Sequence, residues 1–492
     1  MNRLGSRGVA ILLVVAGVAC GQRTIGPEDG RRPDILLITV DDMGLELGAY
    51  GDPHATTPNV DRLAAQGLRF DRAFVVASTC SPSRSTILTG IFPHANGHWG
   101  FVAETRLHDG IRTLPTLLGE AGYRTGLIGK LHVAGADDQL RFDRAQPLEH
   151  GERSPAAFGT AVADFLAAGD GRPFFLMVNS YDPHTPYPGQ EGVAPWPVPH
   201  DPRHVRVPAA ALDTPELRQF LARMYDGYSK ADEFVGATLD ALERAGKADS
   251  TLVLFLSDHG PPLPAAKATL FEAGIHVPLV ARWPGRIEPG RTTDALISGA
   301  DVVPTLLEVA GRTPDPALHG RSFLGLLTGV EPDANPAIYA EGTLDQRQRY
   351  FPQRAVRTGQ FKYIRNLRPE IEFASNSMNW WVDEMLRRWD TDPRARFLLE
   401  RLVRHPREEL YDLERDPEEL RNLAGDPSQA ATLERLRGRL EQWMRATGDP
   451  WVALWDHDPA RPDPLEPSES AAQPLHGAWL DMALEQVRRR SR

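Results

Sequence analysis

Short apolar runs alternate with amphipathic stretches between residue 33 and about residue 284. Apolar runs of strand length separated by helical stretches are typical of a sheet with helices on its faces, so the pattern predicts an α/β fold. Strands are expected at residues 34–40, 124–128, 174–178 and 251–256. Helical spacing predicts one helix over residues 58–67 and a long helix over residues 217–245.

The pattern changes after about residue 336, where Arg, Trp and Glu become more frequent. A strand-like segment at 354–364 and a helical segment at 429–447 indicate a smaller α+β domain in this part of the chain. A proline-rich segment at 458–467 predicts an extended loop, and we expect Trp451 and Trp455 to anchor it by burial.

Polar, titratable side chains follow each of the four predicted strands of the first part. In open α/β sheets ligands bind outside the carboxyl ends of the strands, so residues far apart in sequence meet in one cleft. A single aspartate after a strand is more often a helix N-cap, but four such ends are hard to explain as four caps. The side chains are Asp41 and Asp42, Lys130 and His132, Asp182 and His184, and Asp258 and His259.

The N-terminus has the layout of a signal peptide. Arg3 and Arg7 precede an apolar run at residues 9–18, and Ala19 and Cys20 follow it. The run is shorter than the roughly 20 apolar residues that a membrane helix needs. We therefore expect an exported protein, periplasmic in a bacterium or anchored to the membrane, because Cys20 resembles the lipidated cysteine of bacterial lipoproteins. Cleavage elsewhere by an ordinary signal peptidase is the alternative.

Composition narrows the function classes. The formal charge of −11 and the pI near 5.8 argue against a nucleic-acid surface, which needs clustered Lys and Arg. With 492 residues and 41% hydrophobic content the chain can bury a large core. The predicted divisions are a signal peptide 1–20, a linker 21–32, a large domain 33–335, a smaller domain 336–480 and a basic tail 481–492.

Three carboxylates in one cleft call for a cation. Asp41, Asp42 and Asp258 would repel one another and raise each other's pKa unless a positive ion held them. Oxygen ligands suit Ca²⁺ or Mg²⁺, and the nitrogen of His259 extends the choice toward other divalent metals. For Asp41 and Asp42 taken alone, a solvated turn is the competing interpretation.

After removal of the signal peptide, Cys80 is the only cysteine, so no intramolecular disulfide can form. A buried structural thiol is the simple interpretation, but its neighbours indicate more. Ser83 is predicted to cap a short helix that ends at Gly90. Cys80 would then lie near a positive helix end, one turn from Arg84, which suits a nucleophile that attacks an anion.

The stretch from Cys80 to Gly90 is similar to the signature of the sulfatase family, Cys-x-Pro-Ser-Arg followed by Leu-Thr-Gly. Further family motifs match in order as far as about residue 447. They are Asp41-Asp42, Thr57-Pro58-Asn59 with Asp61, Gly129-Lys130 with His132, Asp182-Pro183-His184, Asp258-His259-Gly260, Lys267, and Glu409-Leu410-Tyr411-Asp412-Leu413 with Asp416-Pro417 and Asn422-Leu423. The resemblance implies the alkaline-phosphatase-like fold, in which a large mixed sheet flanked by helices precedes a smaller C-terminal α+β domain.

The resemblance also implies a modified nucleophile and a metal. A maturation enzyme would oxidise Cys80 to formylglycine, whose hydrated gem-diol attacks the substrate. The implied ion is Ca²⁺, with Mg²⁺ or Mn²⁺ as alternatives. Its ligands would be Asp41, Asp42, Asp258 and His259. Many family members have Asn where this chain has His259, a departure that concerns the identity of the metal more than activity.

The remaining roles concern charge and protons. Arg84 and Lys130 would steady the gem-diol and its alkoxide, and His132 would take a proton when sulfate is expelled. Lys267 and His184 would face the substrate, where they bind sulfate and protonate the leaving group. The sequence does not divide those two tasks between them.

Several stretches look most like the sulfamidase branch of the family, the N-sulfoglucosamine sulfohydrolases and their bacterial relatives. They are residues 96–100, 112–118, 126–133, 257–264, 351–354, 366–367, 449–452 and 473–476. This branch implies removal of the N-sulfate of N-sulfoglucosamine, a heparin or heparan-type sugar, with Asp182 binding the amine or a hydroxyl. A turn aspartate before proline is the other interpretation of Asp182.

Other functions stay open at this stage. An O-sulfatase that acts on glucosamine or aryl sulfates shares the whole core. A phosphate or phosphonate ester hydrolase of the same superfamily often uses Thr or Ser, so Cys80 in the full signature favours sulfate. A catalytically silent sugar-binding protein would lack metal ligands or core bases, and every such position is filled here.

Overall fold

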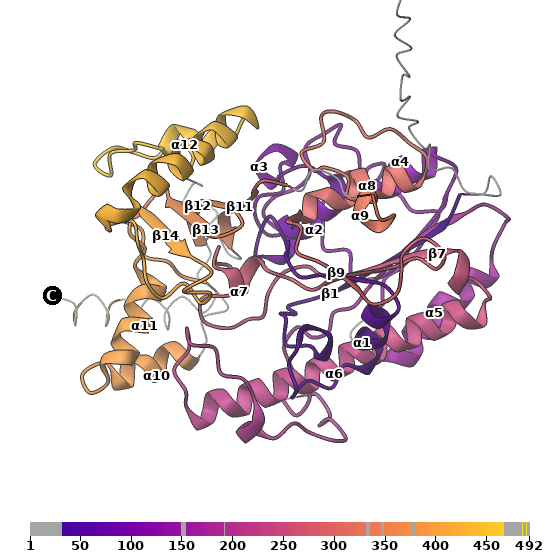
Figure 1. Ribbon diagram of the computed structural model, residues 1–492, viewed down its shortest axis with the longest axis horizontal. Coiled ribbons are helices and arrows are strands. Elements are labelled where there is room, and N and C mark those ends of the chain that lie inside the picture. The colour runs from indigo at the N-terminus through magenta and orange to yellow at the C-terminus, as the bar shows by residue number, and fades with distance from the viewer. Residues whose placement is uncertain are drawn as a thin grey trace, which may run out of the picture.

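A mixed sheet forms the centre of the molecule in this computed structural model (Figure 1). Its strands lie in the order β5-β4-β6-β1-β7-β8-β2-β9. The run from β5 to β7 is parallel, whereas β8 is antiparallel to both of its neighbours. The bounds are β1 Asp34–Val40, β2 Leu68–Phe70, β4 Arg124–Gly129, β5 Arg144–Gln146, β6 Phe174–Asn179, β7 Thr251–Ser257, β8 Leu279–Arg282 and β9 Arg291–Thr293. The four predicted strands are confirmed as β1, β4, β6 and β7.

The structure describes residues 32–148, 154–190, 192–330, 335–345, 349–375, 380–466, 485 and 489. The predicted signal peptide with Cys20, nearly all of the linker, residues 473–476 and most of the basic tail lie outside this part of the chain. None of the described helices combines the length and apolarity that crossing a bilayer requires.

Helices cover both faces of the large sheet because its strands are apolar on both sides. In β1, Leu36 and Ile38 face the layer of α1, α5 and α6, whereas Ile35 and Leu37 face the layer of α2, α4, α8 and α9 (Figure 1). The bounds are α1 Pro58–Ala65, α2 Cys80–Thr89, α3 Pro93–Asn96, α4 Leu114–Glu120, α5 Pro155–Ala167, α6 Pro215–Arg244, α7 Glu272–Ile275, α8 Val302–Val309 and α9 Leu324–Leu327. The predicted helices at 58–67 and 217–245 are confirmed as α1 and α6.

A second, antiparallel sheet lies in the C-terminal part, in the order β11-β12-β13-β14. Its strands are β11 Ile338–Asp345, β12 Arg349–Arg357, β13 Phe361–Asn366 and β14 Glu408–Asp412, and its helices are α10 Trp380–Arg388, α11 Pro393–Val403 and α12 Ala430–Ala446. Two short strands, β3 Ala73–Phe74 and β10 Ile297–Ser298, pair separately. The predicted fold class is confirmed, and α12 confirms the helix expected at 429–447. The residue limits of the two predicted domains stay predictions.

One strand prediction was wrong. The segment 354–364 is a hairpin of β12 and β13, in which Arg357 is paired with Lys362. Thr358 closes the turn, because its backbone N–H donates to the carbonyl of Phe361 and its hydroxyl accepts from the backbone N–H of Phe361. The apolar pattern continues across this turn, so periodicity alone could not reveal it.

A buried ion pair joins β12 to the end of α12. Arg354 is fully buried and donates from Nε and Nη2 to the two carboxylate oxygens of Asp449, at 2.6 and 3.1 Å. Asp449 also accepts the backbone N–H of Trp451. Trp451 and Trp455 are buried, as predicted.

Arg354→Met is expected to lower the free energy of unfolding by about 3–5 kcal/mol, because it leaves Asp449 buried without its cation. The measurement is the melting temperature and the denaturant midpoint. Arg445→Met is the control, since Arg445 forms an exposed pair with Glu441 on α12, where a change of about 0.5 kcal/mol or less is expected. Equal effects of the two substitutions would contradict the prediction.

Candidate active site

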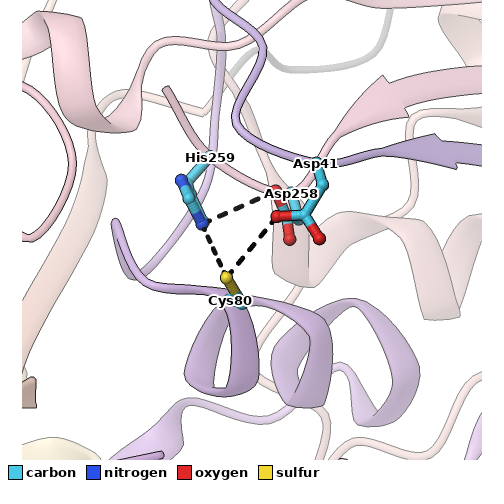
Figure 2. A group of neighbouring side chains, drawn as sticks. All are labelled: Asp41, Cys80, Asp258 and His259. Atoms are coloured by element: carbon cyan, nitrogen blue, oxygen red, sulfur yellow. Dashed lines mark hydrogen bonds and ion pairs between the residues drawn. The ribbon is translucent and has the colours of Figure 1, made fainter. Parts of the chain in front are cut away.

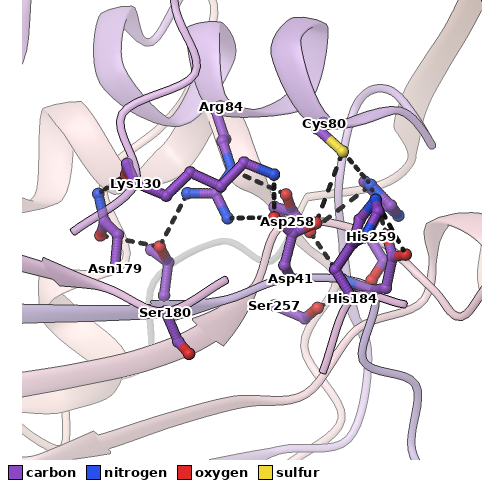
Figure 3. Close-up of polar contacts among 12 residues, drawn as sticks. Asp41, Cys80, Arg84, Lys130, Asn179, Ser180, His184, Ser257, Asp258 and His259 are labelled. Carbon is purple, nitrogen blue, oxygen red and sulfur yellow. Dashed lines mark hydrogen bonds and ion pairs between the residues drawn. The ribbon is translucent and has the colours of Figure 1, made fainter. Parts of the chain in front are cut away.

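Four neighbouring parallel strands, in the order β4-β6-β1-β7, bring the predicted polar residues to one edge of the sheet. Hydrogen bonds connect the loops directly after these strands. Asp42 donates its backbone N–H to Asp258 Oδ1 (3.1 Å), and Asp41 donates its backbone N–H to the carbonyl of Asp182 (3.3 Å). The Lys130 ammonium donates a hydrogen bond to Asp41 Oδ2 (Figure 3). The convergence expected from the sequence is therefore present.

Cys80 is the first residue of α2 and points at this edge (Figure 2). Its Sγ lies 3.2 Å from His259 Nε2, 3.5 Å from Asp41 Oδ1 and 3.8 Å from Lys267 Nζ. The thiol is 3% exposed, and the unpaired N–H groups of the helix start give this position a partial positive charge. A nucleophile at residue 80 would be surrounded by groups that bind anions and protons.

The predicted cap at Ser83 was wrong. α2 begins three residues earlier, after the extended Thr79, and Ser83 donates its backbone N–H to the carbonyl of Thr79. Pro82 is tolerated in this first turn because its missing N–H would have no helical partner. The Ser83 hydroxyl instead donates to the carbonyl of Asp258, which ties the helix to the loop after β7. The predicted helix end at Gly90 is confirmed.

Buried cations offset the buried carboxylates. Arg84 donates from Nε to Asp258 Oδ2 at 2.8 Å and lies 3.4 Å from Asp41 Oδ2 through Nη2. Burial alone would raise the pKa of Asp41, but Lys130 and Arg84 outweigh it and hold that pKa well below its usual range. Asp41 is therefore ionised at neutral pH.

Asp42 has a second set of partners. Lys267 Nζ donates to its Oδ1 at 2.7 Å, and His184 Nε2 lies 3.9 Å from its Oδ2. Burial would raise the pKa of Asp42, yet Lys267 and His184 lower it on balance. Lys267 and His184 thus stand together beside Asp42, on one side of the carboxylate cluster.

The donor set fits a hard divalent cation. Ligand atoms of Asp41, Asp258, His259 and Cys80 all lie within 4.8 Å of one another, and so do those of Asp41, Asp42 and His184. Among the described residues, Asp42 Oδ2 is a buried carboxylate oxygen without a hydrogen-bond partner, which is costly unless an ion binds there. Burial opposes protonation of His259, but Asp258 and its neighbours raise its pKa to about 9. Negatively charged neighbours therefore dominate the surroundings of the His259 ring.

His132 differs from the other titratable groups of the site. Its ring packs edge-on against Phe101, with centroids 4.9 Å apart, and its backbone has φ 58°. Burial, assisted by the charge of Lys130, lowers the pKa of His132 to about 3. The imidazole is neutral at physiological pH and able to accept a proton.

Sequence reasoning missed three polar residues at this edge. Lys230 of α6 lies 3.1 Å from Asp182 Oδ1, and a lysine within a long amphipathic helix gives no sequence signal. Thr39 and Asn179 are linked by a hydrogen bond of 2.8 Å at the ends of β1 and β6. Polar residues that close apolar strands were the available signal for these two.

The comparisons with known proteins agree with this geometry. Residues 33–312 match the profile of the sulfatase family. N-sulphoglucosamine sulphohydrolase of Homo sapiens is 34% identical over 498 aligned positions, which cover 91% of this chain and 95% of that protein. The chain belongs to the sulfatase family. An ulvan-active sulfatase of Formosa agariphila is 30% identical and covers 85% of this sulfatase and 81% of its own length.

A second profile overlaps the end of the sulfatase match and extends into the C-terminal part. Residues 265–375 match the profile described as N-sulphoglucosamine sulphohydrolase, C-terminal. Among solved structures, a 2-O GAG sulfatase has a TM-score of 0.67 at 21% identity and covers 89% of this sulfatase and 99% of that chain. The phosphonate monoester hydrolase of Agrobacterium radiobacter has a TM-score of 0.66 at 22% identity, with 85% and 96% covered. At these identities the structures show a shared fold.

Chelation of divalent cations is expected to lower the melting temperature of this sulfatase, and added Ca²⁺ to restore it, because a bound cation offsets the buried carboxylates. A ligand at 100 times its Kd stabilises by about 2.7 kcal/mol. Thermal melting with Ca²⁺, Mg²⁺ and Mn²⁺ measures the effect. Asp42→Asn should lose most of the shift, whereas Asp226→Asn, at a buried carboxylate paired with His200, should keep it. An undiminished response in Asp42→Asn would refute the cation site.

Proposed function

We propose that this sulfatase uses formylglycine at residue 80 and a divalent cation to hydrolyse the N-sulfate of N-sulfoglucosamine. The placement of Cys80 carries the proposal. It begins a buried helix within the family signature, and its Sγ is 3.2–3.8 Å from His259, Asp41 and Lys267. A maturation enzyme would oxidise Cys80. The chemistry needs two hydroxyl groups on one carbon, and a thiol does not provide them.

The cation would be held by Asp41, Asp42, Asp258 and His259, with Ca²⁺ as the first choice and Mg²⁺ or Mn²⁺ as alternatives. When bound, it withdraws charge from a sulfate oxygen. Arg84, Lys130 and Lys267 would then meet the remaining anionic oxygens, because each already contacts one of these carboxylates at the same edge.

The first half of the reaction transfers the sulfuryl group. One hydroxyl of the residue 80 gem-diol gives its proton to Asp41, whose Oδ1 already accepts from the side chain at residue 80. The hydroxyl oxygen then forms a bond to sulfur, and the S–N bond of the sugar breaks. The electron pair of that bond goes to the nitrogen, which takes a proton from His184 or Lys267 and leaves as an amine. Both side chains stand beside Asp42, on the same side of the cluster.

The second half regenerates the aldehyde. His132 takes the proton of the second hydroxyl, the C=O bond re-forms, and the C–O bond to the sulfate breaks, so sulfate departs with that electron pair. The low pKa of His132 keeps its imidazole neutral, so a ring nitrogen is unprotonated when this proton is released. Addition of water to the aldehyde restores the gem-diol.

The choice of an N-sulfated sugar rests on the relatives. The human relative is named for N-sulphoglucosamine, and the matched C-terminal profile bears the same name. O-sulfate hydrolysis is the second candidate, because a 2-O GAG sulfatase has the same fold. Measuring sulfate release from N-sulfated and O-sulfated sugars separates the two candidates.

Location is part of the proposal. The layout of residues 1–20 supports export, and Cys20 supports a lipid anchor on the periplasmic side of a bacterial membrane. A sulfated sugar outside the cytoplasm would then be within reach of the enzyme.

The matured, cation-loaded protein is expected to release sulfate from N-sulfoglucosamine faster than from glucosamine 6-O-sulfate or an aryl sulfate. Cys80→Ala should lose all turnover and keep its melting temperature, because it removes the nucleophile from a helix that remains buried. Sulfate release is measured by ion chromatography. Turnover of O-sulfates alone would overturn the N-sulfate assignment, and full activity of Cys80→Ala would overturn the mechanism.

His132→Gln is expected to lower kcat by about 10²–10⁴-fold, because it removes the base of the second half. The first half should still run once. Rapid-quench kinetics should therefore give about one glucosamine per active site, with free sulfate far behind, as expected for covalent catalysis. Free sulfate and amine that appear together at the wild-type rate would rule out this role.

A further inference from the structure

A directed chain of hydrogen bonds links the two cations that flank Asp41. Arg84 Nη1 donates to Thr39 Oγ1 at 3.2 Å, and Thr39 Oγ1 donates to Asn179 Oδ1 at 2.8 Å. Asn179 Nδ2 then donates to the backbone carbonyl of Lys130 at 2.7 Å (Figure 3). The four residues are at least nine-tenths buried, so water is largely kept from replacing these bonds.

Chemistry fixes the direction of every bond in the chain. A guanidinium can only donate, so the Thr39 oxygen accepts from Arg84 and spends its one proton on Asn179. The Asn179 amide is then oriented with its oxygen toward Thr39 and its NH₂ toward Lys130. A side chain at position 39 that can neither donate nor accept would break two hydrogen bonds of the chain.

Asn179 holds the backbone of Lys130 from both sides. Its carbonyl accepts the backbone N–H of Lys130 at 3.0 Å, while its side chain donates to the Lys130 carbonyl. Gly129 permits this approach, because a Cβ at residue 129 would lie 2.1 Å from the Asn179 carbonyl oxygen, and its φ is 86°. The start of the loop that carries Lys130 and His132 is therefore locked against β6.

We propose that Thr39 and Asn179 are positioning residues that set the distance between the Arg84 guanidinium and the Lys130 ammonium. Both cations contact Asp41 beside Cys80, and both would meet the reacting oxygens. Within the described residues, Thr39 and Asn179 form these hydrogen bonds with Arg84, Lys130 and each other and none with Cys80, so their effect passes through the two cations. The catalytic consequence rests on the proposed function, whereas the geometric one does not.

Thr39→Val tests the proposal, because valine keeps the shape and removes both hydrogen bonds. We expect kcat to fall about 10–100-fold, since misplacement by about 1 Å costs rates of this order, with KM changed by less than about threefold. Thr39→Ser should restore most of the rate. Thr251→Val is the matched control: Thr251 is a buried threonine that donates to the carbonyl of Lys247 at the opposite end of neighbouring β7. Its kcat should stay at the wild-type value.

Asn179→Asp provides a second route should Thr39→Val fold poorly. The carboxylate still accepts from Thr39 but cannot donate to Lys130, so the same loss of kcat is expected. Formylglycine content, measured by mass spectrometry, is compared among the variants so that rates refer to matured protein.

Crystal structures of the variants give a readout that does not depend on activity. The proposal expects the Arg84 guanidinium or the Lys130 ammonium to move relative to Asp41 in Thr39→Val and not in Thr251→Val. Unmoved cations, or equal kcat values for Thr39→Val and Thr251→Val, would overturn it. An absence of wild-type sulfatase activity alongside displaced cations would instead overturn the proposed function and leave the positioning role supported.

Discussion

Three carboxylates buried side by side are the constraint on which this molecule depends. Asp41, Asp42 and Asp258 have almost no access to water, and ions in such a place are unstable unless opposite charges meet them at close range. The required cations come from three separate segments: α2, the loop after β4 and the loop after β7. Each segment must therefore bring its cation to the same edge of the sheet. Titratable residues consequently occupy positions after the four parallel strands where ordinary turn residues would otherwise stand.

The same constraint makes the site suited to an anion. Every buried cation at the edge is already oriented by a carboxylate, so little reorganisation is needed when a charged oxygen arrives. His132 differs from these cations, because burial keeps it neutral beside Lys130. Fixed charges and a neutral base thereby separate the tasks of holding an anion and moving a proton.

Much of the fold and of the candidate site could be predicted because the relevant signals are local. Buried parallel strands are continuous apolar runs, and titratable residues directly after them stand out in the sequence. That rule located Asp41, Lys130, His184 and Asp258 before any contact was known. The grouping of Cys80 with them depended on the family signature, since a lone cysteine carries no spacing information.

The parts that could not be predicted depend on contacts between distant segments. Serine is a common helix-capping residue, but the Ser83 hydroxyl donates to the backbone carbonyl of Asp258, which lies 175 residues away in sequence. Lys230 looks like any lysine on an amphipathic helix until Asp182 is placed beside it. The hairpin at Thr358 is set by a turn that interrupts an otherwise continuous strand pattern. In each case tertiary partners decide what the local sequence leaves open.

The packing of α10 and α11 bears on the order in which the chain can fold during synthesis. Trp381 and Leu398 belong to the same apolar core as α6, and the ring of Trp381 lies 5.3 Å from that of Phe220. A nascent chain that has emerged only as far as α9 already holds every cation and carboxylate of the site, yet one end of α6 still faces water. The apolar core around α6 is therefore complete only after residues translated more than a hundred codons after Lys267 have packed against it.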